Sequence, residues 1–335
     1  PWYMSVSPFE IQPVPGRGLG LVATRDIAKG ECILREEPLF TYDKAGQPSE
    51  ETIKESVKWE GLAEAARSQF GDLCDNTTEG EGEKTFLGIM ESNGFSVGDE
   101  DDSTQVGVCL VGARFNHSCV PNVSSVLRQD ANTLEQRTYA NEAIPCGTEL
   151  TVSYVDMTLT HTERRAALQS KYHFDCTCPV CTMDSKAISE RDAALTNLKT
   201  LRTATSDSPA EVLKAAVPIE AIITQHLGAN PVELSSLAWE ALTACAQLRN
   251  QKMPLVQRYF DMASRDLTVS QRKTVRKQLK VKIGKQMPLP PLTVPETDSE
   301  GEAEAAAEVV DVKPVKTTAP KGKGKGKRDR RNRRR

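Results

Sequence analysis

Three cysteines near the middle of the chain stand so close together that they limit what the surrounding segment can become. Cys176, Cys178 and Cys181 form a C-x-C-x-x-C pattern. Zn²⁺ binds thiolates and takes four ligands in a tetrahedron, so this pattern predicts a metal site that still lacks one ligand. No His or Cys follows at the usual zinc-finger spacing. A local disulfide and three free thiols are the alternatives, and zinc is favoured over both.

The remaining cysteines are scattered. Nine cysteines, three clustered and six apart, do not form a disulfide framework, which indicates a reducing compartment. Five of the scattered ones lie mostly among apolar neighbours, and small buried side chains are the expectation for all of them. They are Cys32, Cys74, Cys109, Cys146 and Cys245.

Nothing in the sequence indicates a membrane. No apolar run approaches the ~20 residues that a membrane-spanning helix needs. Residues 1–4 lack a basic region followed by an apolar stretch, so no secretory signal is expected there. A nuclear or cytoplasmic location, or both, is therefore expected.

Charge is distributed unevenly. The net charge is −3, but the last fifteen residues carry nine net positive charges and the rest carries twelve net negative ones. Residues 288–335, acidic and then basic, have almost no apolar bulk and are predicted to be disordered. The basic tail fits a nuclear import signal, nonspecific nucleic-acid contact through phosphates, or a solvated tail without a partner, and these stay open.

The apolar pattern indicates a β-rich region followed by helices. Short strands are predicted at 19–23, 32–34, 106–111, 123–127 and 150–154. Helical spacing marks residues 49–91, and 75–84 is expected to be an exposed loop. After Cys181, helices are predicted at 185–204, 208–226, 231–250 and 255–282, and one of them carries a core-facing apolar stripe from Leu234 to Cys245.

Three motifs carry a resemblance. They are Gly16-Arg17-Gly18-Leu19-Gly20, the run Arg-Phe-Asn-His-Ser-Cys-Val-Pro-Asn over 114–122, and Tyr-His-Phe-Asp-Cys-Thr-Cys-Pro-Val-Cys over 172–181. In this order they resemble the SET-domain family of protein lysine methyltransferases, especially its SET-and-MYND branch. The MYND zinc module is missing, because Cys74 stands alone in the segment where paired cysteines would be needed.

The resemblance implies an α+β fold. A β-rich SET core would cover 8–157, with a helical insert at about 49–91. Its Asn-His-Ser-Cys segment and the strand ending in Tyr154 would form a pseudoknot. Residues 158–182 would be a zinc-bound post-SET segment, and 185–285 a helical C-terminal domain. The fourth zinc ligand would be Cys119.

The cofactor implied by the resemblance is S-adenosylmethionine. The glycine turn alone is a weak signal, and it lacks the strand–turn–helix context of a dinucleotide site. The family pattern assigns cofactor contacts to eight residues: Arg17, Gly18, Leu19, Asn93, Asn116, His117, Tyr154 and Phe174. The other histidines, His161, His173 and His226, receive no role.

Catalysis is assigned by the same pattern to two tyrosines. Tyr154 ends the strand Glu149-Leu150-Thr151-Val152-Ser153-Tyr154, and Tyr172 precedes the zinc cysteines. Methyl transfer to lysine needs a neutral amine, and an apolar channel disfavours the ammonium form. The expected activity is therefore a protein-lysine N-methyltransferase acting on a histone or another protein. The alternatives are a catalytically weak SET scaffold for chromatin or protein interaction, and an enzyme for cytoplasmic lysines.

Overall fold

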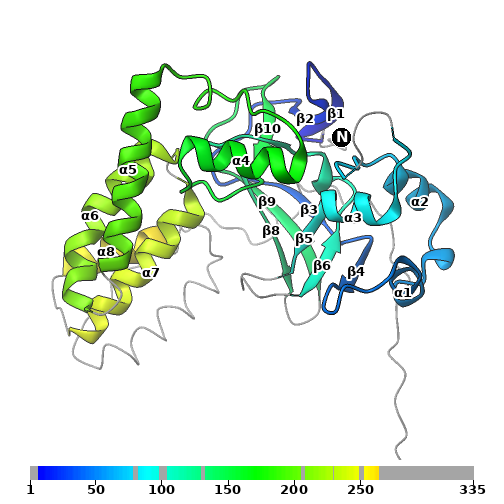
Figure 1. Cartoon of the computed structure of the whole chain (residues 1–335). Helices are drawn as coiled ribbons and strands as arrows, with labels where there is room; N and C mark the ends of the chain where they lie inside the picture. Colours follow the sequence, from blue (N-terminus) through cyan, green and yellow to red (C-terminus); the bar gives the residue numbers. More distant parts are fainter. Residues whose placement is uncertain are drawn as a thin grey trace, which may run out of the picture.

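A computed structural model describes most of the chain up to Ala263 and shows a β-rich centre between two helical regions (Figure 1). The described residues are 7–77, 82–97, 104–129, 133–204, 208–228, 230–248 and 253–263. The predicted disordered tail at 288–335 lies outside them. The domain boundaries predicted from the sequence stay a prediction.

One four-stranded sheet joins segments that are far apart in the sequence. Its strands are β1 (Phe9–Val14), β2 (Gly18–Ala23), β10 (Glu149–Val152) and β7 (Asn116–His117), in the order β1-β2-β10-β7. The turn between β1 and β2 has positive φ angles at Gly16 and Gly18, which suit glycine. β10 runs parallel to β7, with Thr151 opposite Asn116. This is the pairing that the predicted pseudoknot requires.

Two three-stranded sheets complete the β-rich centre. One has the order β3 (Cys32–Glu36), β9 (Leu134–Ala140), β8 (Val123–Gln129), and the other has β4 (Phe40–Asp43), β6 (Gln105–Val108), β5 (Gly94–Ser96). All five predicted strands are present, but β6 ends at Val108 instead of residue 111. The chain turns there because the Glu36 carboxylate accepts hydrogen bonds from the main-chain N–H groups of Val111 (2.9 Å) and Gly112 (2.8 Å).

Two similar turns in the sequence pack against each other. Ile27 and Ile144 form an antiparallel bridge, with reciprocal main-chain hydrogen bonds of 2.8 and 2.9 Å. Gly30 and Gly147 take positive φ angles of 80° and 81° at equivalent points. The two turns, at Ile27 and Ile144, therefore connect the first sheet to the second.

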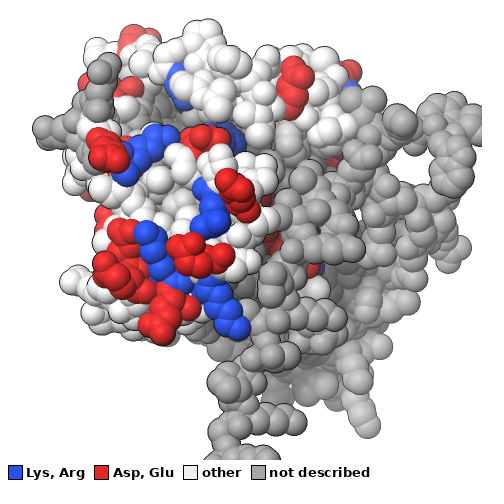
Figure 2. Space-filling view, turned by 90° about the vertical axis from the view of Figure 1, so that its right-hand side faces the viewer, with Lys and Arg blue, Asp and Glu red and all other residues white. Residues whose placement is uncertain are grey.

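The insert is helical, as predicted, and packs on β4 and β6. It contains α1 (Glu50–Ser56), α2 (Glu64–Gly71) and α3 (Phe86–Asn93). Its core is built on four aromatic rings, each within 6.4 Å of another, from Phe40, Trp59, Phe70 and Phe86. Acidic and basic side chains are intermixed on its outer face (Figure 2), where Lys54 pairs with Glu50 and Arg67 with Glu60.

The C-terminal helices pack on one another beside the sheets (Figure 1). They are α5 (Ser185–Ala204), α6 (Pro209–His226), α7 (Pro231–Gln247) and α8 (Met253–Ala263). The stripe from Leu234 to Cys245 faces their shared core, as predicted. The predicted helix 255–282 begins at Met253, and its part beyond Ala263 lies outside the described residues. Among the described helices, none combines the length and apolarity that crossing a membrane demands.

The expected burial of the scattered cysteines is wrong for two of the five. Cys74 and Cys146 are exposed, and Cys32 is half-buried, whereas Cys109 and Cys245 are buried as predicted. The predicted exposed loop from residue 75 begins with a buried side chain, because Asp75 accepts hydrogen bonds from Thr77 and Thr85. The other described residues of this loop, Thr77 and 82–84, are exposed as predicted, apart from the half-buried Asn76.

Candidate active site

The four cysteines predicted as metal ligands lie together. Cys119 follows β7, and the other three follow α4 (His161–Tyr172). All four sulfurs lie within 4.8 Å of one another, and Cys119 Sγ is 3.5 Å from Cys181 Sγ and 4.0 Å from Cys176 Sγ. Zn–S bonds of about 2.3 Å in a tetrahedron place sulfurs about 3.8 Å apart. The donor set, its burial and its size therefore fit Zn²⁺.

Local structure explains how the C-x-C-x-x-C segment reaches Cys119. α4 starts at a capping box, in which Thr160 and Glu163 bond reciprocally. The helix ends at His173, whose left-handed conformation (φ 55°) turns the chain. The Cys181 N–H then donates to the Cys178 carbonyl (2.9 Å), and the Cys178 N–H donates to Cys176 Sγ (3.4 Å). These bonds aim the three thiols at one point.

His117 joins the cysteine cluster to the tyrosine strand. Its Nδ1 accepts a hydrogen bond from the main-chain N–H of Tyr154 (3.0 Å), so the ring proton is on Nε2, which faces Cys119 Sγ at 3.3 Å. Burial lowers the pKa of His117 to about 4, which keeps the ring neutral near pH 7. A neutral imidazole with a fixed tautomer can donate to a cysteine sulfur.

A polar triad brings two predicted cofactor residues together. Glu149 accepts from the Arg17 guanidinium (2.5 Å) and from the Asn116 side-chain amide (2.8 Å). Arg17 also donates to the main-chain oxygen of His117. Gly20 is packed so closely here that a Cβ would lie 2.7 Å from the Asn116 amide nitrogen. Glu149 belongs to the strand motif before Tyr154, and its acidic side chain opposite the Arg17 turn is the sequence signal for this contact.

Two aromatic residues surround Tyr154. Its ring centre lies 4.8 Å from that of Tyr172 and 5.3 Å from that of His117, and Phe174 lies 6.0 Å from His117. The Tyr154 hydroxyl donates to the Phe115 carbonyl at 2.6 Å. Burial raises the pKa of Tyr154, so it stays protonated at neutral pH. The structure thus brings both predicted catalytic tyrosines together, beside the Asn116-His117 segment.

The remaining predicted cofactor residues are placed differently. The Asn93 amide nitrogen donates to the carbonyls of Cys74 and Ile89, both at 2.7 Å, and so ties α3 to the loop before it. The Leu19 carbonyl lies 3.4 Å from the Asn116 amide nitrogen, while the Leu19 side chain is exposed. Gly18 has open space around its α-carbon. Their contacts with a cofactor stay a prediction.

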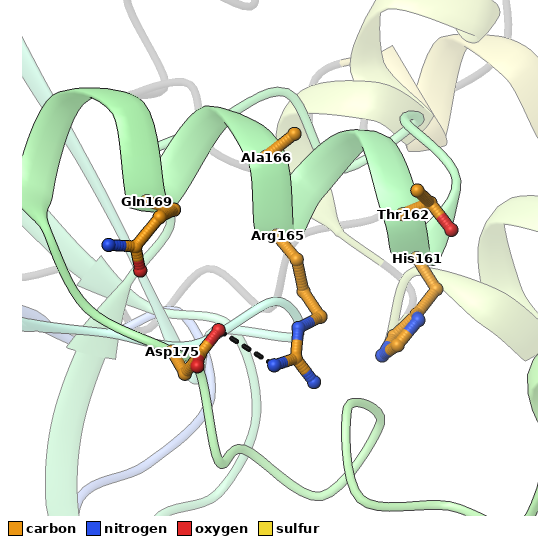
Figure 3. Close-up of a pocket in the computed structure, with 6 residues that line it drawn as sticks. All are labelled: His161, Thr162, Arg165, Ala166, Gln169 and Asp175. Atoms are coloured by element: carbon orange, nitrogen blue, oxygen red, sulfur yellow. Dashed lines mark hydrogen bonds and ion pairs between the residues drawn. The ribbon is translucent and has the colours of Figure 1, made fainter.

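A separate hollow of about 470 Å³ lies along α4 (Figure 3). An ion pair of 2.7 Å between Arg165 and Asp175 crosses it, and the His161 side chain extends from the same helix. Tyr154, Tyr172 and the four cysteines are not among its lining residues. The hollow is therefore distinct from the aromatic site.

One part of the chain matches a known domain. Residues 18–155 match the model of the SET domain. This stretch includes the β1–β2 turn from Gly18 onward, the Asn116-His117 segment and Tyr154. This part of the chain, residues 18–155 of 335, is similar to a SET domain.

Individual relatives are similar over part of their length. The chain is 32% identical to histone-lysine N-methyltransferase set5 of Schizosaccharomyces pombe over 54% of this chain and 52% of that protein. It is 30% identical to human histone-lysine N-methyltransferase SMYD1 over 29% of this chain and 22% of that protein. The chain thus spans about half the length of set5 and less of SMYD1. The Neurospora SET-domain protein DIM-5, a histone lysine methyltransferase, aligns with 19% identity and a TM-score of 0.27 over 45% of this chain and 53% of that one.

Proposed function

We propose that this chain is a protein-lysine N-methyltransferase that uses S-adenosylmethionine. The observation that carries the proposal is the position of Tyr154. Parallel pairing of β10 with β7 sets its hydroxyl on the Phe115 carbonyl, immediately before Asn116 and His117. In a SET domain, this arrangement would place the tyrosine that contacts the reacting groups next to the segment that binds the cofactor.

The cofactor would be held by the eight residues predicted from the sequence, which are Arg17, Gly18, Leu19, Asn93, Asn116, His117, Tyr154 and Phe174. S-adenosylmethionine supplies, when bound, an electrophilic methyl group on a sulfonium sulfur. The positive φ and the open space at Gly18 let the backbone pass close to a ligand, and the missing side chain of Gly20 makes room for the Asn116 amide. Glu149 holds Arg17 and Asn116 in place from one side.

The tyrosines would prepare the lysine. Free lysine has a pKa of about 10.4, so only about one molecule in 2,500 is neutral at pH 7. Aromatic side chains disfavour the ammonium by excluding water, and they leave the nitrogen lone pair free to attack. Tyr154 and Tyr172, with ring centres 4.8 Å apart, would form the wall that orients the amine. Positioning of this kind can lower a barrier by about 7–11 kcal/mol in favourable cases.

Zinc would have a structural role. Four cysteine ligands form a closed site with no open position for substrate. Cys119 follows the cofactor segment, and Cys176, Cys178 and Cys181 follow Tyr172 and Phe174. The ion would therefore fasten the aromatic wall to the cofactor segment.

Histone lysine is the substrate class that we favour, with a nuclear location. Two relatives, set5 and SMYD1, are named histone-lysine N-methyltransferases. The predicted nucleic-acid contact of the basic tail would fit chromatin, but the tail lies outside the described residues.

Methyl transfer in a cell extract tests the proposal. The full chain is incubated with methyl-labelled S-adenosylmethionine and a whole-cell protein extract, and the labelled residues are mapped by mass spectrometry. Label on lysine amines that disappears with Asn116→Ala supports the proposal. Cofactor binding without any transferred label would contradict it and favour a SET scaffold that binds without methylating.

A further inference from the structure

Two arginines are buried in the described part of the chain without an ion pair. Arg164 on α4 is 0% exposed and Arg191 on α5 is 3% exposed. Arg164 donates to the Leu159 carbonyl, and Arg191 Nε donates to the His226 carbonyl at 3.2 Å. Arg164 Nε and both terminal nitrogens of Arg191 have no hydrogen-bond partner there. A buried charge without a counter-charge is strongly unfavourable.

Both arginines lie on helices that flank the post-SET cysteine segment in the sequence, Arg164 on α4 before it and Arg191 on α5 after it. Leu168, one turn after Arg164 on α4, packs into the cluster itself. Arg191 donates to the His226 carbonyl, and the turn after His226 contacts Val120, the residue that follows Cys119. In this turn, a Cβ placed on Gly228 would lie 2.6 Å from Val120 Cγ1. Arg164 thus lies one helical turn from a residue packed on the cysteines, and Arg191 binds the segment that contacts the neighbour of Cys119.

Electrostatics supports this placement. Burial is the main reason that the pKa of Arg191 falls from 12.5 to about 10. Arg164 also lowers it, whereas Cys119, Asp192 and Cys181 raise it. Asp192 accepts a hydrogen bond from the His161 N–H instead of forming an ion pair with Arg191. Cys119 and Cys181 are therefore, with Asp192, the groups near Arg191 that can carry a negative charge.

The negative charge of the zinc-loaded site would be equal and opposite to that of the two arginines. Zn²⁺ with four thiolates has a net charge of −2, because each ligand must lose its proton to bind. Two guanidinium groups neutralise it. Arginine suits such a position, since its guanidinium is weakly hydrated and stays charged when buried.

We propose that Arg164 and Arg191 are the buried counter-cations of the zinc–cysteine cluster, and that they couple zinc binding to the packing of the C-terminal helices. The proposal rests on the proposed zinc site. It assigns the two arginines to the surroundings of the metal, next to His117, which faces Cys119 Sγ. Partners outside the ligand shell commonly change metal affinity by about 10–100-fold.

The test measures zinc affinity and thermal stability of the full chain. Zinc dissociation constants come from competition with a chromophoric chelator, for wild type, Arg164→Met, Arg191→Met and Arg191→Lys. Arg202→Met is the matched control, because Arg202 lies on the same helix α5 but pairs with Glu233 at 2.6 Å. Thermal unfolding of each protein is followed with zinc and after metal removal.

We expect the Met variants to bind zinc about tenfold or more weakly, Arg191→Lys to recover most of the loss, and Arg202→Met to match wild type. The Met variants should lose melting temperature only in the zinc-loaded protein, since removing an unbalanced cation costs nothing once the metal is gone. An equal loss with and without zinc would show a packing role and overturn the proposal, as would unchanged zinc affinity. A wild type that binds no zinc would also overturn it.

The outcome is independent of catalysis. None of these measurements uses cofactor or substrate, so a chain that transfers no methyl group can still show the coupling. Conversely, an active enzyme with unchanged zinc affinity in Arg191→Met would refute the counter-cation role alone.

Discussion

The hydroxyl of Tyr154 donates a 2.6 Å hydrogen bond to the main-chain oxygen of Phe115, across 39 positions of sequence. Phe115 directly precedes β7, and Tyr154 follows β10. The bond therefore closes the junction between the two parallel strands at the point where a lysine and a cofactor would meet. It also holds the Tyr154 ring between His117 and Tyr172.

Glu149 should matter for cofactor affinity. Glu149→Gln removes the charge that pairs with Arg17 while keeping an oxygen that can accept from Asn116. Hydrogen bonds to charged groups contribute about 1.5–3 kcal/mol, so we expect the dissociation constant of S-adenosylmethionine to rise about tenfold or more. Calorimetric titration measures it. Glu135→Gln, which breaks a pair with Arg35 away from this site, should bind the cofactor normally. Normal cofactor binding by a folded Glu149→Gln variant would show that Glu149 does not contribute to the cofactor site.

Removal of one thiol should abolish zinc binding and loosen the aromatic wall. Cys178→Ser leaves three thiolates, and we expect metal analysis of the purified variant to find no stoichiometric zinc, with a lowered melting temperature. Cys245→Ser is the control, because Cys245 is a buried thiol in α7 far from any metal motif. Full zinc content in Cys178→Ser would exclude Cys178 as a ligand.

Asp75 should make the stability of the insert depend on pH. Burial raises its pKa, but hydrogen bonds from Thr85 and Thr77 prevail and lower the pKa from 3.8 to about 2. The folded state therefore prefers the charged form. The stabilisation is complete above the unfolded-state pKa and is lost as the pH falls from about 4 toward 2. The difference in unfolding free energy between wild type and Asp75→Asn should shrink between pH 7 and pH 3. A difference that stays constant over this range, in chemical denaturation experiments, would refute the role of the charge.

Contiguous motifs contain most of the residues that the structure brings together around Tyr154 and the four cysteines. The run from Glu149 to Tyr154 and the C-x-C-x-x-C segment are both short, and the second follows a helix, α4, that a local capping box begins. Cys119, by contrast, is 57 positions from Cys176, and only the family resemblance joined them. Spacing alone cannot reveal a ligand brought in by sheet pairing.

Side-chain environment was harder to predict. Arg164 and Arg191 lie in helical patterns whose charged residues usually face water, yet both are buried. Cys74 and Cys146 have apolar neighbours in the sequence but lie in exposed turns. Burial depends on which distant elements pack together, and the local pattern does not contain that information.

The most direct test of the central claim is a single-turnover comparison of wild type with Tyr154→Phe at saturating S-adenosylmethionine, using a protein substrate found in the extract. Tyr42→Phe is the control, since Tyr42 lies in β4, in a different sheet. We predict that Tyr154→Phe binds the cofactor like wild type but forms methyl-lysine at least about tenfold more slowly, because a hydroxyl that orients the reacting groups contributes in the range of about 1.4 kcal/mol or more. Equal rates in wild type and Tyr154→Phe, with lysine methylated in both, would contradict the role assigned to Tyr154. No methyl-lysine from wild type with cofactor bound would contradict the methyltransferase itself.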